Sequence, residues 1–257
     1  MATYTTEIAS DKIVSDNPIH QRLLKAYYAA IPYVGGDLLE VGCGEGRGVE
    51  LLSPLSTQYV ALDKITDIIE KLSQSHKNVS FRQAIVPPFS GIADNSFDVV
   101  VSFQVIEHIQ DDNFFLKEIF RVLKPGGKAL ISTPNIKKTL TRNPWHIREY
   151  TAAQLTTLTE SVFSKVESKG ITGNKKVMEY YEMNKASVKK ITRFDFLNLQ
   201  YRLPASLLRI PYDIMNRVNR NLLQKNNTDL VTDISHEDYL VSDKPDESLD
   251  LFYILHK

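Results

Sequence analysis

A glycine-rich turn has the residue types needed to hold a ligand against the backbone. The sequence Glu40-Val-Gly-Cys-Gly-Glu-Gly46 follows an apolar run and precedes a helical pattern. Glycine lacks a side chain, so Gly42, Gly44 and Gly46 allow the chain to turn sharply and to approach a ligand closely. The turn lacks both the Gly-x-Gly-x-x-Gly spacing of dinucleotide-binding loops and the Gly-Lys-Ser/Thr ending of Walker loops. We therefore expect a ligand outside those two classes.

Two histidines are candidates for proton transfer. His108 directly follows Glu107, and an imidazole with an unperturbed pKa accepts a proton near neutral pH. His146 lies in the segment Asn143-Pro-Trp-His-Ile-Arg-Glu-Tyr150. We expect a structural role for Glu107. His108 acts either as a general base or only in shaping a pocket, and His146 is either a base or a surface histidine.

The side chains around His146 suit a polar ligand. Trp145, Arg148 and Tyr150 combine aromatic surface with hydrogen-bond donors, a mixture found in sites for polar small molecules. They are the candidate substrate-binding residues, although Trp145 is equally compatible with a place in the core.

These residues must be positioned by strands and helices that alternate along the chain. Apolar runs alternate with helical patterns from Asp37 to about Pro134, which is typical of a parallel sheet covered by helices. A helix is also predicted from His20 to Ala30, and Thr151 is predicted to cap a helix that runs to about Glu160. Ligands of such sheets bind outside the carboxyl ends of the strands, so the glycine turn and His108 should lie at the same edge. Strands are expected at residues 37–42, 58–63, 78–83, 97–102, 127–133, 163–168 and 249–255.

Five motifs, found in order, resemble those of the class I S-adenosylmethionine-dependent methyltransferases, in particular their small-molecule group. They are Leu39-Glu-Val-Gly-Cys-Gly-Glu-Gly-Arg-Gly48, Asp63, Asp94-Asn-Ser-Phe-Asp98, Val105-Ile-Glu-His-Ile109 and Arg121-Val-Leu-Lys-Pro-Gly-Gly127. The resemblance implies an α/β fold: a Rossmann-like doubly wound, mainly parallel seven-stranded sheet with an antiparallel last strand and a helical insertion. It also implies S-adenosyl-L-methionine as the cofactor.

The resemblance assigns residues to this cofactor. The three glycines would bring the chain against its methionine and ribose parts, with Glu40 beneath the loop, ordering it or reaching the amino group through water. Asp63 would accept hydrogen bonds from both ribose hydroxyls, and it is also placed to cap the following helix. The expected cofactor-binding residues are Glu40, Gly42, Cys43, Gly44, Gly46, Asp63, Lys64, Gln83, Ala84, Ser102 and Gln104.

The adenine end of the expected site departs from the family pattern. Many relatives carry an acid after the third strand, where this sequence has Gln83. Its amide oxygen would accept from the adenine amino group, and the backbone N–H of Ala84 would reach the ring. Ile65 or Ile85 would cover the adenine face.

Residues 169–228 differ in charge from the rest of the chain. They contain twelve Lys or Arg against four Asp or Glu, and their apolar residues recur at helical intervals. We expect two or three amphipathic helices that form a lid or substrate-selecting cap on a methyltransferase domain of residues 1–168 and 229–257. The positive excess favours an anionic or lipid-linked acceptor, or attachment to an acidic membrane surface. A solvated helical face or an oligomer contact is the alternative.

The composition of the chain limits its possible partners, metal sites and cellular location. The chain has 31 basic and 31 acidic residues, so its bulk charge gives no argument for a nucleic-acid partner. Cys43 is the only cysteine, which excludes an internal disulfide and the zinc sites built from paired cysteines, and we predict no metal. Residues 1–16 show no secretory pattern, so we expect a cytoplasmic protein. The sequence does not define an oligomeric state.

Two classes of function fit the motifs. The first is methyl transfer to a small-molecule acceptor, and the alternative is a catalytically inactive cofactor-binding protein with a regulatory or scaffold role. Methylation of RNA or DNA is a weaker third hypothesis, because the Asn/Asp-Pro-Pro-Tyr/Phe signature of base amino methylation is absent after the fourth strand.

Overall fold

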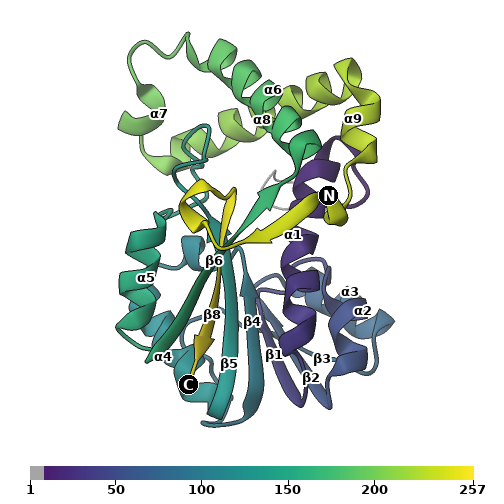
Figure 1. Ribbon diagram of the computed structural model, residues 1–257, viewed down its shortest axis with the longest axis vertical. Coiled ribbons are helices and arrows are strands. Elements are labelled where there is room, and N and C mark those ends of the chain that lie inside the picture. The colour runs from purple at the N-terminus through teal and green to yellow at the C-terminus, as the bar shows by residue number, and fades with distance from the viewer. Residues whose placement is uncertain (1–8) are drawn as a thin grey trace.

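An eight-stranded sheet forms the centre of the computed structural model, which describes residues 9–257. The strand order is β3-β2-β1-β4-β5-β8-β6-β7 (Figure 1). The first five strands run parallel, β8 is antiparallel to both β5 and β6, and β7 is antiparallel to β6. The strands are β1 (Asp37–Val41), β2 (Gln58–Asp63), β3 (Ser80–Gln83), β4 (Phe97–Phe103), β5 (Leu123–Pro134), β6 (Lys165–Gly173), β7 (Tyr239–Ser242) and β8 (Asp250–His256).

Helices cover both faces of the sheet because its buried strands carry apolar residues on both sides. In β1, Leu38 packs with residues of α1, α2 and α3, whereas the next residue, Leu39, packs with α4 and α5 on the opposite face. Alternate side chains of a strand point to opposite faces, so one apolar strand supports two cores. The helices are α1 (Asn17–Ala30), α2 (Val49–Leu52), α3 (Thr66–Ser75), α4 (Asp112–Val122), α5 (Ala152–Glu160), α6 (Lys175–Thr192), α7 (Leu199–Arg202), α8 (Ala205–Asn226) and α9 (Thr228–Asp233).

The doubly wound α/β sheet with antiparallel strands near the C-terminus is confirmed, but the predicted number of seven strands is wrong. The eighth strand, β7, is only four residues long and pairs with β6 at the edge of the sheet. The adjacent residues Leu240 and Val241 on this strand are both exposed, so β7 lacks the apolar alternation that marks a half-buried strand. The predicted cap of α5 is present, since Thr151 and Gln154 form a capping box.

The helices of residues 169–228 lie beyond one end of the sheet, together with α9 (Figure 1). The first five residues of this range belong to β6, and α6, α7 and α8 follow. A buried carboxylate, Asp16, ties α8 to the N-terminal part by accepting from Arg217 at 2.7 Å and from Arg220 at 3.0 Å. The division into a domain and a lid remains a proposal, and residues 1–8 of the predicted domain lie outside the described residues.

Among the helices placed between residues 9 and 257, none combines the length and apolar character needed to cross a bilayer.

Candidate active site

The glycine turn connects β1 to α2 at the carboxyl end of the sheet. Gly42, Gly44 and Gly46 all have positive φ angles, of 82°, 50° and 82°. A side chain at Gly42 would also meet an obstacle, because an added Cβ would lie 2.3 Å from Cγ2 of Val105. The amide of Gly42 donates to the Leu62 carbonyl at 2.8 Å, which holds the turn against the end of β2. Glycine is therefore required here both for backbone conformation and for space.

Glu40 lies beneath this turn as a buried carboxylate. It accepts from the hydroxyl of Tyr27 at 2.7 Å and from that of Tyr59 at 2.5 Å. Burial raises the pKa of Glu40, while the two tyrosine hydrogen bonds oppose that shift. The side chain thus joins α1, β1 and β2 below the turn.

Asp63 orders the turn from the end of β2. One carboxylate oxygen accepts from the amide of Gly44 at 2.8 Å, and the other accepts from the amide of Ile65 at 3.0 Å. Helix α3 begins only at Thr66 with Ile65 as its N-cap, so the expectation that Asp63 itself caps this helix is corrected. The carboxylate instead bridges the glycine turn and the start of the next loop.

A cavity of about 270 Å³ opens along the turn. Gly44 and Asp63 line one part of it, and Ile65 and Ile85 line another. Ile85 is 77% exposed, which leaves an apolar side chain at the cavity rim able to cover the face of an aromatic ring. The expected cofactor residues that line this cavity are Gly42, Cys43, Gly44, Asp63, Lys64, Ala84 and Gln104.

The other expected cofactor residues, like Glu40, support the walls of this cavity. Gly46 packs against Leu72, and the hydroxyl of buried Ser102 donates to the Val41 carbonyl at 3.1 Å. Gln83 is exposed, and its amide nitrogen donates to the carbonyl of Lys64 at 3.3 Å.

The expectation for the Ala84 amide is corrected. It donates to the Asp63 carbonyl at 2.8 Å in the ladder that extends β3, so its hydrogen is already engaged. Ala84 nevertheless lines the cavity.

Some wall residues were not predicted from the sequence. Arg47 donates to the Ala9 carbonyl at 2.7 Å and thereby joins the turn to Ala9, which also lines the cavity. Leu23 and Tyr27 of α1, the helix predicted from His20 to Ala30, also line the cavity. The signal for Arg47 was its position immediately after the third glycine.

A second cavity, of about 250 Å³, lies next to the first. Four residues line both cavities: Ala9, Leu23, Gln104 and His108. Gln104 has a positive φ of 58°, and its amide donates to the Ser132 carbonyl at 2.8 Å, which fixes the chain where it leaves β4. The two cavities therefore share a wall at the carboxyl end of β4.

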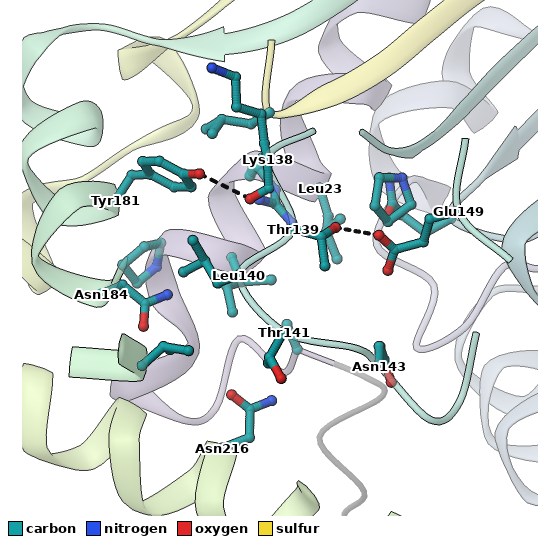
Figure 2. Close-up of a pocket in the computed structure, with 18 of the residues that line it drawn as sticks. Leu23, Lys138, Thr139, Leu140, Thr141, Asn143, Glu149, Tyr181, Asn184 and Asn216 are labelled. Carbon is teal, nitrogen blue, oxygen red and sulfur yellow. Dashed lines mark hydrogen bonds between the residues drawn. The ribbon is translucent and has the colours of Figure 1, made fainter. Parts of the chain in front are cut away.

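The helices α6 and α8, which follow β6, form part of the wall of the second cavity. Figure 2 shows Tyr181 and Asn184 of α6 and Asn216 of α8 around the loop that contains Thr139. The hydroxyl of Tyr181 donates to the Lys138 carbonyl at 3.0 Å, so this loop is tied to α6. Side chains capable of hydrogen bonding thus face the cavity from several elements.

Glu107 and His108 are in the 3₁₀ turn Ile106–His108 after β4, and both line the second cavity. One oxygen of Glu107 accepts from Thr133 at 3.0 Å, whereas Oε1 is buried and has no hydrogen-bond partner among residues 9–257. Burial raises the pKa of Glu107 to about 7. Nδ1 of His108 lies 2.9 Å from the Trp145 carbonyl, which can only accept, so Nδ1 carries the hydrogen.

His146 lines the second cavity close to His108. The two rings meet edge to face with their centroids 4.9 Å apart. Nδ1 of His146 lies 2.6 Å from Glu149, and Nε2 lies 2.8 Å from the side-chain nitrogen of Asn143. Its side chain is only 14% exposed, which excludes the surface-histidine alternative.

The three predicted substrate-binding residues hold this loop in place. Trp145 donates to Asp213 of α8 at 3.2 Å. Arg148 and Tyr150 both donate to Asp112 at the start of α4, at 2.5 Å and 2.8 Å. Trp145, Arg148 and Tyr150 are therefore not among the described residues that line the second cavity, although their neighbours in the sequence are. Their polar groups face α4 and α8 instead.

Part of the chain is similar in sequence to known methyltransferases. Residues 39–131 match the family model described as a methyltransferase domain. A probable S-adenosylmethionine-dependent methyltransferase of Mycolicibacterium smegmatis is 40% identical over 138 residues, which cover 52% of this chain and 53% of that protein. A ubiquinone biosynthesis O-methyltransferase of Xanthomonas oryzae is 31% identical over 111 residues, covering 42% and 46%. The chain thus spans about half the length of the curated relatives it matches.

Two solved structures share the fold over nearly the whole chain. One, from Thermotoga maritima, is described as an S-adenosylmethionine-dependent methyltransferase and possible histamine N-methyltransferase. It has a TM-score of 0.58 at 15% identity and covers 95% of this chain and 91% of its own. The other, an S-adenosylmethionine-dependent methyltransferase from Archaeoglobus fulgidus, has a TM-score of 0.55 at 15% identity, with coverage of 92% and 94%. At these identities the likeness shows the fold alone.

Proposed function

We propose that this chain transfers a methyl group to a hydroxyl-bearing small molecule. The premise is that residues 39–131 place the chain among the class I S-adenosylmethionine-dependent methyltransferases. The observation that carries this proposal is the wall shared by the two cavities. His108, Gln104 and Leu23 line both the cavity at the glycine turn and the polar cavity under α6 and α8. A donor in the first cavity and an acceptor in the second would meet at this wall.

The first cavity fits S-adenosyl-L-methionine. The cofactor carries no phosphate, and the site offers close backbone approach at Gly42 and Gly44 together with the carboxylate of Asp63. Each carboxylate oxygen of Asp63 accepts one backbone hydrogen bond and has a further lone pair, which would accept from a ribose hydroxyl. Ile65 and Ile85 would cover the adenine. When bound, the cofactor supplies an electrophilic methyl group on a sulfonium.

The residues at the shared wall align the acceptor and exclude water, which are the main requirements of an in-line displacement. A hydroxyl acceptor must also lose a proton. His108 and His146 lie at that wall or next to it, so we assign the removal of this proton to their site.

Several features support an oxygen acceptor of neutral charge. The cations that line the second cavity include Arg22 and Arg220, and each is paired with a buried carboxylate, Asp250 at 3.1 Å and Asp16 at 3.0 Å. The two paired guanidinium groups are therefore largely neutralised, which leaves Lys138 as the lining cation for which no ion pair is found among residues 9–257. The Xanthomonas oryzae relative is named as an O-methyltransferase, which agrees with an oxygen acceptor.

The exposed face of α8 supports an acceptor that is presented at a lipid surface. Leu207, Ile210, Ile214, Val218 and Leu222 are between 49% and 72% exposed and recur every three or four residues, so they share one face of the helix. Scattered single apolar residues are ordinary at a surface, but a continuous apolar helix face marks an interaction site.

Exposed cationic side chains occur on the segments that precede this face in the chain. Lys189, Lys190 and Arg193 at the end of α6 and Arg202 before α8 are exposed, whereas Arg209 of α8 is stacked on the Trp145 ring, 4.4 Å from its centroid. An apolar face accompanied by cations is the arrangement that binds an anionic bilayer surface. We therefore assign an anionic membrane surface as the partner of α8.

Flotation with phosphatidylglycerol vesicles tests this partner. The chain should float with these vesicles and not with phosphatidylcholine vesicles, and Ile210→Ser with Ile214→Ser should abolish flotation. Leu240→Ser, at an exposed apolar residue of β7, is the matched control and should float like the wild type. Equal recovery of the wild type and the double variant would contradict the assignment.

Release of S-adenosylhomocysteine tests the function itself. Incubation with the labelled cofactor and a panel of hydroxyl-bearing lipids and phenols should give product that depends on both the acceptor and His108. His108→Ala should lose turnover while it still binds S-adenosylhomocysteine. Cofactor binding without turnover on any acceptor would instead indicate an inactive cofactor-binding protein.

A further inference from the structure

We propose that Glu107, His108 and His146 form a binding site for a first-row divalent transition-metal cation in the wall of the acceptor cavity. One possible ligand atom from each of these residues lies within 4.8 Å of those of the other two. Two imidazoles and a carboxylate are a donor set that suits zinc and its neighbours. The sequence predicted no metal, because it has a single cysteine and because the three residues come from two separate segments.

The buried carboxylate is an independent observation that points to a ligand. Glu107 is 1% exposed, lines the cavity, and has an oxygen, Oε1, without a hydrogen-bond partner among residues 9–257. Thr133 satisfies the other oxygen. Buried polar atoms are nearly always paired, so an unpaired carboxylate oxygen in a polar cavity indicates a missing partner.

Each of the two histidines is held by a hydrogen bond at Nδ1, as histidine ligands of metals usually are. The Trp145 carbonyl fixes the hydrogen of His108 on Nδ1, so Nε2 is the nitrogen that would bind the cation. Glu149 holds Nδ1 of His146 at 2.6 Å, and this carboxylate in turn accepts from Thr139. A carbonyl or carboxylate behind each imidazole is the usual outer arrangement of histidine ligands. Ligation through Nε2 of His146 would displace its contact with the Asn143 amide.

The site deepens the proposed function and rests on it. Three protein ligands leave a position open for an oxygen of the acceptor, as in catalytic zinc sites. A hydroxyl bound to the cation would lose its proton to water, with neither histidine acting as the direct base, since a divalent cation lowers the pKa of a bound oxygen acid. The resulting oxygen nucleophile would lie on the acceptor side of the wall, where the methyl group arrives.

Direct binding measurements test the site without relying on activity. Tag-free protein is treated with a chelator, dialysed, and titrated by calorimetry with Zn²⁺, Mn²⁺ and Mg²⁺, and bound metal is counted by mass spectrometry. We expect one Zn²⁺ per chain, bound more tightly than Mn²⁺ and far more tightly than Mg²⁺. Co²⁺ should give visible absorption that Zn²⁺ displaces.

Matched variants distinguish the site from adventitious binding. Glu107→Gln and His146→Gln should each weaken Zn²⁺ binding by at least about 100-fold, and Glu149→Gln by about 10- to 100-fold. His256→Gln is the control, because this histidine also pairs with a glutamate, Glu167 at 2.7 Å, but on the strands β8 and β6. It should bind Zn²⁺ like the wild type.

Glu107→Gln also separates the two proposals. Glu107 lines the acceptor cavity but not the cofactor cavity, so this variant should keep its affinity for S-adenosylhomocysteine. Retained cofactor binding would also show that the variant folds. If wild type and Glu107→Gln take up the same amount of each metal with the same affinity, the metal site is refuted while the methyltransferase proposal stands.

Discussion

The contact between Gly42 and Val105 makes a quantitative prediction about the cofactor turn. In Gly42→Ala, the new Cβ would lie 2.3 Å from Cγ2 of Val105, at a residue with φ of +82°. The positive φ costs an alanine roughly 1–2 kcal/mol. Forcing a methyl group into an occupied space adds about 1–3 kcal/mol. The variant should therefore lose about 2–5 kcal/mol of unfolding free energy.

A second substitution separates these two costs. Val105→Ala removes the obstructing methyl groups, so in the double variant only the cost of the positive φ should remain. Gly42→Ala should then cost about 1–3 kcal/mol less in the Val105→Ala background than in the wild type.

Urea unfolding of the four proteins measures this coupling, and calorimetry with S-adenosylhomocysteine follows the turn itself. The single variant Gly42→Ala should bind the ligand more weakly than the double variant does. Free energies that add within about 0.5 kcal/mol would refute the reasoning, because residues in steric conflict cannot act independently.

Three further predictions follow from the hydrogen bonds around the site. Asp63→Ala should weaken S-adenosylhomocysteine binding by about 10- to 100-fold, since hydrogen bonds to a charged group contribute about 1.5–3 kcal/mol; calorimetry showing unchanged affinity would contradict this role. Asp16→Ala leaves two arginines of α8 without their buried carboxylate and should cost about 3–5 kcal/mol in urea unfolding, and a loss below about 1 kcal/mol would argue against the anchor. Tyr59→Phe removes a hydrogen bond that lowers the pKa of Glu40. Burial already raises this pKa in the folded protein, and the variant should raise it further, so the folded state loses stability as the pH rises through the pKa of Glu40. Urea unfolding should show a greater loss for Tyr59→Phe at pH 8 than at pH 5, and an equal loss would oppose this account.

The parallel half of the fold could be predicted because its signals are local. Strand β1 carries Leu38, Leu39 and Val41 within five residues, and the glycine turn follows it at once. The turn lines a cavity as expected, and Asp63 lies at the same edge. By contrast, β7 is a short edge strand whose pairing with β6 depends on residues far away in the sequence. No periodic pattern marks such a strand.

The acceptor side was harder to predict because it depends on contacts between distant segments. Trp145, Arg148 and Tyr150 have the residue types of a binding site, yet their donors bind Asp213 and Asp112. Tertiary packing determines whether each of these donors binds a ligand or an acceptor elsewhere in the protein. The proximity of Glu107 to His146 likewise appears only when the loop after β5 folds back beside the end of β4.

Calorimetric titration of the purified wild-type chain with S-adenosylhomocysteine is the most direct test of the central claim, that the cavity at the glycine turn binds the adenosyl cofactor. We predict saturable binding with one molecule per chain. The absence of heat at millimolar ligand from protein shown to be folded would contradict it.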